Sequence, residues 1–277
     1  MIAAKKVFCL NELGRRSNNE DSVSPQKGSA APGERLFVVC DGVGGENKGE
    51  VASALVCSAI RDYYEANREG ATSRDFLLQA IEHANSQLVA YAAEDSSARR
   101  MSTTLSLALV CPDRVIVAWC GDSRIHHIRN GKVVWMSSDH SLVYELVRSG
   151  ELSEHEAAVH PQRNIITRSL NAGNRNNLVD FYELSQIAEG DYILLCTDGF
   201  LEQIKAAQIS NTLTDTEPED KAAAFRQLCE GKTRDNFSMY LIQLTLQPLL
   251  QKQPATLKTV LIVLLFLIIG LFLFALL

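Results

Sequence analysis

Four short apolar runs, each bounded by acidic or turn residues, most constrain what this 277-residue chain can fold into. Continuous apolar runs of this length are typical of β-strands that are buried on both faces, as under helices in a layered fold. A further segment, 102–110, alternates well, and we expect it to pair with 115–119 through the turn at 111–114. The four runs lie at 36–40, 115–120, 192–197 and 237–242.

Helical segments do not alternate strictly with these strands. The patterns predict helices at 50–66, at 73–93 with Ser73 as a potential N-cap, and at 217–230. A doubly wound parallel sheet needs regular strand–helix alternation, so this order favours an α+β layered sandwich. We expect residues 1–246 to form this domain, since that length suffices for one large domain or two small ones.

The C-terminal residues 259–277 contain no charged or strongly polar side chain. At about 1.5 Å per residue, a helix of this length spans the roughly 30 Å hydrocarbon core of a bilayer. The alternative is a buried core helix, but such a helix normally carries a polar stripe. We therefore expect a linker at 247–258 and a single-pass transmembrane helix at 259–277. Lys252 and Lys258 precede this helix, which favours a cytoplasmic location for the domain.

Charge and cysteine content exclude several classes of protein. The net charge of −6 argues against broad nucleic-acid binding, which needs a basic face. An anionic substrate must therefore be attracted by a few local cations. The seven cysteines form no C-x-x-C pair, and most lie in apolar runs, which predicts buried thiols in a reducing compartment. The N-terminal residues lack the long apolar region of a signal peptide.

Acidic residues stand at the ends of three predicted strands. Asp41 and Asp198 each follow a strand and precede a glycine, and Asp235 comes just before a strand. A lone Asp-Gly is usually a turn, but three such sites beside buried strands suggest that the carboxylates converge. Two carboxylates about 4 Å apart repel by about 4 kcal/mol at an effective dielectric constant of about 20, so three need a cation. Oxygen ligands predict Mg²⁺ or Mn²⁺ rather than zinc.

Short motifs follow one another in a fixed order along residues 7–246. They are RSNNEDS at 16–22, VCDGVGG at 39–45, GEVAS at 49–53, STT at 102–104, GDSR at 121–124, DHS at 139–141, HPQRNIITR at 160–168, LCTDG at 195–199 and RDNFS at 234–238. In this order they resemble the PPM family, the metal-dependent protein phosphatases of the type 2C class, and its bacterial members in particular. The resemblance implies a four-layer αββα sandwich of two antiparallel sheets flanked by helices, with metal ions in the cleft between the sheets.

The resemblance also implies a set of metal ligands. Asp41 would bridge two ions, Mg²⁺ or Mn²⁺, and the Gly42 carbonyl would bind one of them. Asp198 and Asp235 would bind the other ion. Asp122 matches the position that holds a third, weaker ion in bacterial members.

Other matched residues imply how the substrate is held. Arg16 matches the phosphate-binding arginine and, with Asp41 and Asp198, completes the implied catalytic set. Glu20 and Asp21 match an acidic pair near the metals, where Asp21 holds metal-bound water and Glu20 is a ligand in some members. A guanidinium suits this task because its planar fork can hold a phosphate with two donors.

The chain departs from the family pattern at a few positions. Val43 and Glu46 stand where many members have histidine, which leaves the leaving-group acid unassigned. Ser102 replaces the glycine before the two threonines. Residues 143–184 correspond to the flap beside the site, and Asn236 is expected as a neighbour of the metal ligands.

The implied activity is hydrolysis of phosphoserine and phosphothreonine in proteins by a hydroxide that bridges two metal ions, without a phosphoenzyme. The implied partners are phosphorylated proteins, among them a serine/threonine kinase or its substrates. One alternative is a catalytically weak phosphoprotein-binding scaffold at the membrane, although all core metal positions are filled. A second alternative is a hydrolase of small phosphate esters, which the sequence leaves open.

Overall fold

The computed structural model describes residues 1–43, 48–173, 179–215 and 221–248. The chain divides into two units, Met1–Leu246 and Gln247–Leu277. The predicted transmembrane helix at 259–277 and all but the first two residues of the predicted linker lie outside the described residues. Among the residues that are described, no helix is long and apolar enough to cross a membrane.

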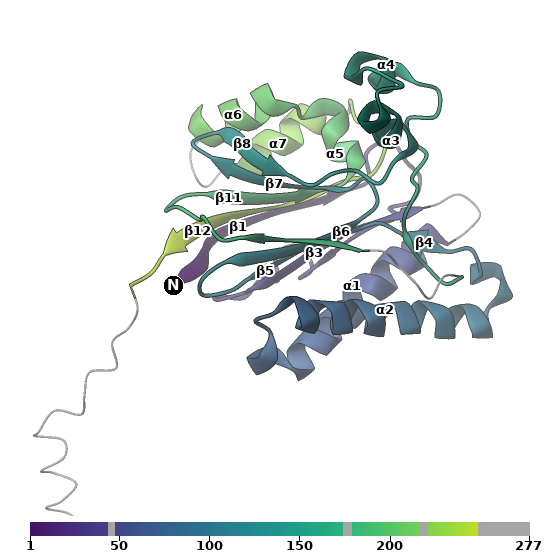
Figure 1. The fold of residues 1–277 in the computed structure, drawn as a ribbon, viewed down its shortest axis with the longest axis horizontal. Helices are drawn as coiled ribbons and strands as arrows, with labels where there is room; N and C mark the ends of the chain where they lie inside the picture. The colour runs from purple at the N-terminus through teal and green to yellow at the C-terminus, as the bar shows by residue number, and fades with distance from the viewer. Residues whose placement is uncertain (44–47, 174–178, 216–220, 249–277) are drawn as a thin grey trace, which may run out of the picture. The chain divides into compact units, whose positions relative to one another are not determined.

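Two antiparallel sheets form the centre of the first unit (Figure 1). One sheet has five strands in the described part of the chain, in the order β1-β12-β11-β7-β8. Its first and last strands in sequence, β1 and β12, pair along most of their length. The strands are β1 (Ile2–Glu12), β7 (Arg124–Arg129), β8 (Lys132–Met136), β11 (Tyr192–Cys196) and β12 (Phe237–Leu246).

The second sheet contains the remaining described strands, in the order β10-β6-β5-β3-β4-β9, with β2 paired to β3. The predicted hairpin is confirmed, because β5 and β6 pair from Val110 opposite Val115 onward. The strands are β2 (Asp21–Ser24), β3 (Leu36–Val43), β4 (Ser102–Thr103), β5 (Leu105–Val110), β6 (Val115–Cys120), β9 (Leu170–Asn171) and β10 (Asp180–Leu184).

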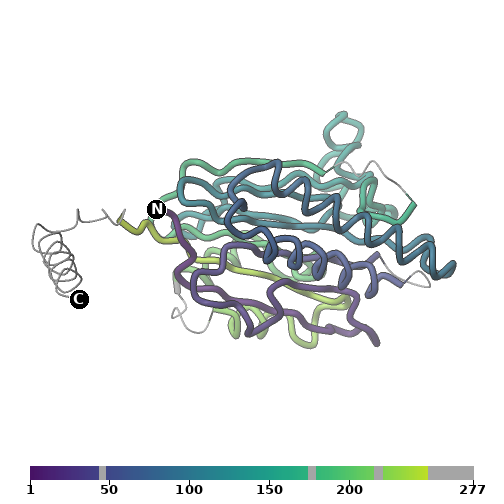
Figure 2. Tube along the Cα trace, turned by 90° about the horizontal axis from the view of Figure 1, so that it is seen from below, coloured from purple at the N-terminus to yellow at the C-terminus, as the bar shows by residue number. Residues whose placement is uncertain are grey.

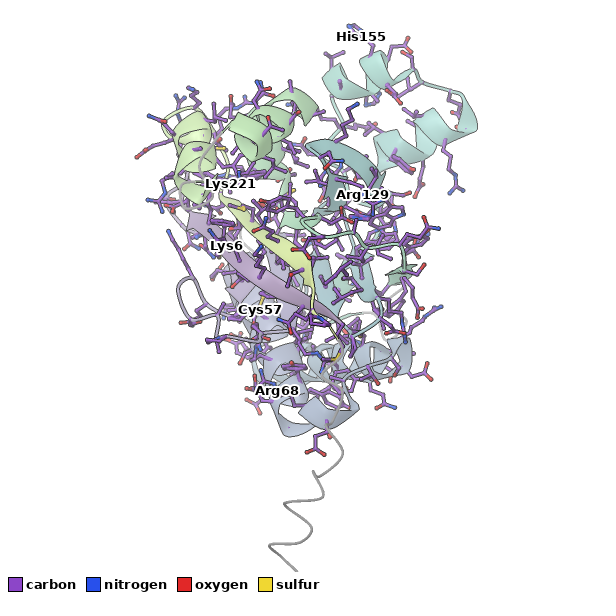
Figure 3. The ribbon with its side chains drawn as sticks, turned by 90° about the vertical axis from the view of Figure 1, so that its left-hand side faces the viewer. Lys6, Cys57, Arg68, Arg129, His155 and Lys221 are labelled. Carbon is purple, nitrogen blue, oxygen red and sulfur yellow. The ribbon has the colours of Figure 1, made fainter. Side chains whose placement is uncertain are left out.

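Helices cover the outer face of each sheet. The helices α1 and α2 lie across the seven-stranded sheet, as the view from below shows (Figure 2), and α5, α6 and α7 lie over the five-stranded one (Figure 1). The helices α3 and α4 stand at one end of the sandwich (Figure 1), where His155 of α4 is exposed (Figure 3). The helices are α1 (Gly49–Ala66), α2 (Arg74–Glu94), α3 (Leu142–Ser149), α4 (Glu154–Val159), α5 (Asp198–Gln203), α6 (Ala206–Asp215) and α7 (Lys221–Cys229), with 3₁₀ turns at Arg68–Gly70 and Ser96–Ala98.

Three apolar cores separate the four layers. Alternate residues of β3 face opposite ways, so Val38 packs toward α1 and α2 while Val39 packs between the sheets. A third core lies between the five-stranded sheet and α5–α7, around Phe200 and Phe225. Every residue of β5 and β6 is buried, because each sheet has a layer on both faces. The arrangement confirms the α+β prediction of two antiparallel sheets flanked by helices.

Several local predictions differ from the structure. The run 102–110 is not one strand, since it breaks at Thr104, whose backbone N–H turns to the carbonyl of Asp41 at 2.8 Å. The helix expected at 217–230 is described only as α7, and α6 before it was not predicted. Lys221 of α7 donates to the carbonyls of Thr212 and Leu213 in the last turn of α6 (Figure 3).

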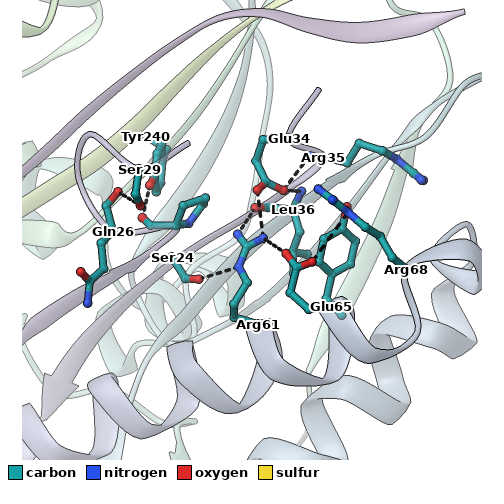
Figure 4. A network of polar contacts seen from close by, with 12 residues as sticks. Ser24, Gln26, Ser29, Glu34, Arg35, Leu36, Arg61, Glu65, Arg68 and Tyr240 are labelled. Carbon is teal, nitrogen blue, oxygen red and sulfur yellow. Dashed lines mark hydrogen bonds and ion pairs between the residues drawn. The ribbon is translucent and has the colours of Figure 1, made fainter. Parts of the chain in front are cut away.

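An arginine of α1 fastens this helix to the strands that carry the site (Figure 4). The guanidinium of Arg61 donates to Ser24 at 3.1 Å, to the carboxylate of Glu34 at 3.0 Å and to the carbonyl of Leu36 at 2.8 Å. Ser24 ends β2 and Leu36 begins β3, so one side chain holds both strands. Glu65 adds a more exposed ion pair at 3.2 Å.

Candidate active site

Asp21 and Asp41 stand opposite each other in the β2–β3 pair. Directly opposed residues of an antiparallel pair have Cβ atoms only about 4.5–5.5 Å apart, so the two carboxylates are neighbours. Asp21 is buried, whereas Asp41 is half-buried. The backbone N–H of Gly42 donates to the carbonyl of Glu20 at 3.0 Å. A Cβ on Gly42 would lie 2.2 Å from the carbonyl oxygen of Gly49, so only glycine fits beside Asp41.

The two threonines of the STT motif hold the backbone of Asp41. The hydroxyl of Thr103 donates to the Asp41 carbonyl at 2.9 Å, and the Asp41 N–H donates to the hydroxyl of Thr104 at 3.0 Å. The Thr104 hydroxyl also lies 2.7 Å from that of Ser123, next to Asp122. The two adjacent threonines therefore link Asp41, at the end of β3, to the turn between β6 and β7 that carries Asp122.

Thr197 links Asp21 to the helix that carries Asp198. Its hydroxyl donates to Asp21 Oδ2 at 3.0 Å and accepts from the N–H of Ser238 at 3.0 Å. The next residue, Asp198, opens α5 and is half-buried. A Cβ on Gly199 would lie 2.0 Å from the carbonyl oxygen of Asn236, so the start of α5 packs closely against the segment that contains Asp235.

Asn236 ties the N-terminal loop to this edge of the site. Its Oδ1 accepts from the N–H of Glu20 at 2.9 Å, and its Nδ2 donates to the carbonyls of Leu13 and Asn18 at 2.8 Å and 2.9 Å. The same loop carries Arg16, whose guanidinium donates to Asp235 Oδ2 at 2.6 Å. Asn236 is thus the neighbour of the acidic residues that the sequence predicted.

The acidic residues lie close enough together to affect one another's ionisation. Burial raises the pKa of Asp41 well above its ordinary value, and the charges of Asp21, Asp198, Asp122 and Asp235 raise it further. Burial, together with neighbouring carboxylates, raises the pKa of Asp21 and that of Asp122 to about 7 each. The pKa of Asp198 is raised by burial first and then by Asp235. The three strand-end residues that the sequence singled out therefore converge.

Arg16 and Glu20 lie on the side of this cluster nearest Asp235. The hydrogen bond to Asp235 is the main cause that raises the pKa of Arg16, and the charges of Glu20 and Asp41 act in the same direction. The Arg16 side chain is 54% exposed, so its guanidinium is accessible to a substrate. Glu20 is half-buried, and its backbone carbonyl accepts from the N–H of Gly42 and from Ser53 Oγ at 2.6 Å.

The donors suit a hard divalent cation in their chemistry. They are carboxylate and carbonyl oxygens, which Mg²⁺ and Mn²⁺ prefer, and their raised pKa values show that joint ionisation is costly without a cation. In the side-chain positions described, no group of three or more His, Cys, Asp or Glu residues is arranged to hold a metal ion.

Comparison with known proteins decides the family. Residues 12–243 match the family model described as protein phosphatase 2C. The chain belongs to the protein phosphatase 2C family. Protein phosphatase PhpP of Streptococcus pneumoniae is 31% identical over 216 residues, which cover 77% of this chain and 86% of PhpP.

Solved phosphatases share the fold of this protein phosphatase 2C member. The serine/threonine phosphatase of S. agalactiae is 32% identical with a TM-score of 0.73, and the match covers 89% of this chain and 100% of that chain. The catalytic domain of the serine/threonine phosphatase PstP, in complex with two manganese ions, is 26% identical with a TM-score of 0.73. That match covers 88% of this chain and 100% of the PstP chain. The family predicted from the motifs is confirmed.

Two residues that hold this phosphatase site together have roles that the sequence did not predict. Thr197 joins Asp21 to the Asp198 helix, but the two acidic residues are distant in sequence and no local pattern relates them. Gly14 has a φ of +62°, and a Cβ there would lie 1.9 Å from the carbonyl oxygen of Asp235. A glycine in the loop before Arg16 was the available signal for this close approach.

Proposed function

We propose that this protein phosphatase hydrolyses phosphoserine and phosphothreonine in proteins with two divalent ions, Mg²⁺ or Mn²⁺, held by the acidic cluster. Asp41 and the Gly42 carbonyl would bind one ion. Asp41, Asp198 and Asp235 would bind the other. Asp122 would bind a third ion, and Asp21 and Glu20 would lie near the bound ions. The observation that carries this proposal is that carboxylates beside strands of both sheets lie together, with Asp21 opposite Asp41 in the β2–β3 pair and Asp235 packed against the start of the Asp198 helix.

When bound, such ions supply Lewis acidity and an activated water for in-line attack on phosphorus. The residues of the chain bind the substrate and position the acidic side chains. Arg16 leaves Asp235 and holds the phosphate dianion through its planar, two-donor guanidinium. Thr103 and Thr104 keep Asp41 in place, and Thr197 keeps Asp21 and Asp198 together, so that charge stabilisation needs little rearrangement during the reaction.

The test is hydrolysis of a phosphothreonine peptide by the purified full chain in detergent. Activity is measured with Mn²⁺, with Mg²⁺ and with chelator, alongside Asp198→Asn. Turnover that requires a divalent ion and is lost in the variant supports the proposal. A folded protein that binds Mn²⁺ but turns over no substrate would instead support the scaffold alternative. Hydrolysis of p-nitrophenyl phosphate without hydrolysis of any phosphopeptide would favour the small-ester alternative.

The C-terminal segment supports a second proposal. We propose that residues 259–277 anchor the phosphatase as a single-pass transmembrane helix with its catalytic domain in the cytoplasm. The uninterrupted apolar sequence and the two preceding lysines support this. The anchor would raise the effective concentration of the enzyme near a membrane-bound serine/threonine kinase or its substrates. Membrane pelleting that survives alkaline carbonate, and is lost when the chain stops after residue 258, would support it. A fully soluble full-length chain would refute it.

A further inference from the structure

His140 makes two hydrogen bonds to the residue before Asp122. The backbone N–H of His140 donates to the carbonyl of Gly121 at 2.9 Å, and the N–H of Gly121 donates to His140 Nδ1 at 3.2 Å. Because Nδ1 accepts a hydrogen bond, the proton of the neutral imidazole lies on Nε2. His140 is buried, and burial is the main cause that lowers its pKa, which favours this neutral form.

The other ring nitrogen of His140 faces β10. Nε2 donates to Asp180 Oδ2 at 3.1 Å, while Arg168 donates to Oδ1 of the same carboxylate at 3.3 Å. The carbonyl of His140 accepts from the N–H of Thr167 at 2.8 Å. The ring also stacks on the indole of Trp119, with centroids 6.4 Å apart and an angle of 16° between the planes. Hydrogen bonds at both ring nitrogens and the contact with Trp119 therefore hold the side chain in place.

His140 precedes α3 and Thr167 follows α4, and these two helices stand at one end of the sandwich (Figure 1). We call residues 141–167 the α3–α4 segment. It begins at Ser141, the N-cap of α3, and Ser141 forms an isolated bridge with Ile166. No residue of α3 or α4 is fully buried. The contacts at the two ends of the α3–α4 segment are therefore important for holding it to the sandwich.

The turn that carries Asp122 is held from its other side as well. Arg124 donates to both oxygens of Asp139, at 2.7 Å and 2.5 Å. Gly121 has a φ of +104°, and a Cβ there would lie 2.7 Å from the methyl carbon of Thr104. The adjacent residues Asp139 and His140 thus hold the two ends of the turn, one through Arg124 and one through Gly121.

We propose that His140 is a positioning residue that couples the Asp122 turn to the α3–α4 segment. Its Nδ1 accepts from Gly121 of the turn, and its Nε2 donates to Asp180, which also binds Arg168, the residue that follows the segment. A phosphoprotein that moves the segment shifts Thr167 and Arg168, and the ring of His140 transmits that shift to Gly121. The inference rests on the proposed function for the role of Asp122 as an ion ligand. The coupling itself is carried by the contacts of the protein alone.

Two substitutions separate the two arms of the ring. His140→Asn keeps an acceptor near the position of Nδ1, so the bond from Gly121 survives and the bond to Asp180 is lost. His140→Gln reaches toward the position of Nε2, so it keeps the Asp180 arm and loses the Gly121 arm. Asp180→Asn weakens the Asp180 arm from its other end, and this side chain is 48% exposed, so the substitution should leave the fold intact.

Amide hydrogen exchange of the full chain, measured without added metal, is the first readout. Loss of one hydrogen bond speeds local opening by about fivefold, since such a bond is worth about 1 kcal/mol. His140→Gln is expected to speed exchange in residues 119–124, and His140→Asn and Asp180→Asn in residues 141–167. Equal changes in both regions for both histidine variants would show a merely structural role and overturn the proposal. If neither histidine variant folds, unchanged exchange at 141–167 in Asp180→Asn overturns it.

Kinetics supply the second readout. His140→Asn and Asp180→Asn are expected to raise KM for a phosphopeptide by about fivefold and to leave KM for p-nitrophenyl phosphate unchanged. His140→Gln is expected to raise the Mn²⁺ concentration needed for half-maximal activity. An equal loss on both substrates in all variants would count against coupling. If the wild-type chain hydrolyses neither substrate, the proposed function fails, and the exchange pattern still decides the role of His140.

Discussion

The guanidinium of Arg16 donates a 2.6 Å hydrogen bond to the carboxylate of Asp235. One carboxylate thereby serves two purposes, since Asp235 is also a proposed metal ligand. The Arg16 side chain is 54% exposed and that of Asp235 is 32% exposed, so the pair lies at the mouth of the acidic cluster and not in its interior. A phosphate or a metal ion that enters the site must compete with this pair.

Replacing Arg16 should separate substrate binding from metal binding. Arg16→Ala is expected to lower kcat/KM for a phosphopeptide by about 10- to 100-fold, because a hydrogen bond to a charged group is worth about 1.5–3 kcal/mol. Mn²⁺ affinity, measured by calorimetry without substrate, should stay the same or increase, because a competing cation has left Asp235.

The neighbouring arginine is the matched control for this experiment. Arg15 is also exposed, and its guanidinium donates to the carbonyl of Gly231 at 3.1 Å rather than to an acidic residue. Arg15→Ala should therefore leave kcat/KM within about twofold of the wild type, as expected for a surface site. Weaker Mn²⁺ binding in Arg16→Ala would contradict the competition described above.

Thr197 offers a test of how the acidic residues are held together. Thr197→Val keeps the shape of the side chain but removes the hydroxyl that bonds Asp21 and Ser238, whereas Thr197→Ser keeps the hydroxyl. The valine variant should lose about 1–3 kcal/mol of stability, since a buried donor and acceptor lose their partner. We expect kcat to fall in the valine variant and to be largely retained in the serine variant, in steady-state assays. Equal kcat values would show that this hydroxyl does not organise the site.

The strands that the sequence predicted are those that are largely buried. The strands β5 and β6 are buried on both faces, so their sequences are apolar throughout and easily recognised. The strand β2 escaped prediction because its four residues, DSVS, include two serines and an aspartate. Such short strands are stabilised by their neighbours and not by their own propensity.

The sequence predicted more of the acidic cluster than of the short strands. Asp41, Asp198 and Asp235 were singled out because each stands at a strand end, and the structure brings them together. The contacts that fix them were not predicted, since the bond from Thr197 to Asp21 joins residues 176 positions apart. Hydrogen bonds of that kind depend on tertiary packing, and a single sequence carries no local signal for them.

Metal removal should make stability depend on pH in an unusual direction. The pKa values of Asp21 and Asp122 are each raised to about 7, from an ordinary value of about 4. The folded metal-free protein therefore binds these protons more tightly than the unfolded chain does. Its free energy of unfolding should fall as pH rises from about 4 to about 7 and then level off. Thermal unfolding in chelator between pH 5 and pH 8 measures this trend.

Two comparisons isolate the groups responsible for that trend. Asp21→Asn removes one titrating group, so the loss of stability with rising pH should be smaller than in the wild type. Asp113→Asn changes a carboxylate that is 69% exposed and should leave the trend unchanged. Added Mn²⁺ should stabilise the protein more at pH 8 than at pH 5, because ions bind the ionised carboxylates. A wild-type trend identical to that of Asp21→Asn would contradict the assignment.

The ion pair of Arg61 with Glu34 should stabilise the two strands that carry Asp21 and Asp41. The Arg61 side chain is 17% exposed and that of Glu34 is 5% exposed, so Arg61→Met leaves a nearly buried carboxylate without its cation. We expect a loss of about 3 kcal/mol in the free energy of unfolding, measured by urea denaturation in chelator. Loss of the exposed partner alone, in Glu65→Gln, should cost less than about 1 kcal/mol.

A compensating substitution tests whether the unpaired charge of Glu34 causes this loss. Glu34→Gln keeps an acceptor for the N–H groups of Arg35 and Leu36, which Glu34 Oε1 accepts at 2.8 Å and 2.9 Å, but it removes the charge. In the Arg61→Met background it should therefore restore part of the lost stability, because the unpaired charge is the costly element. If the double variant is as unstable as Arg61→Met, the loss comes instead from the bonds that Arg61 makes to Ser24 and Leu36.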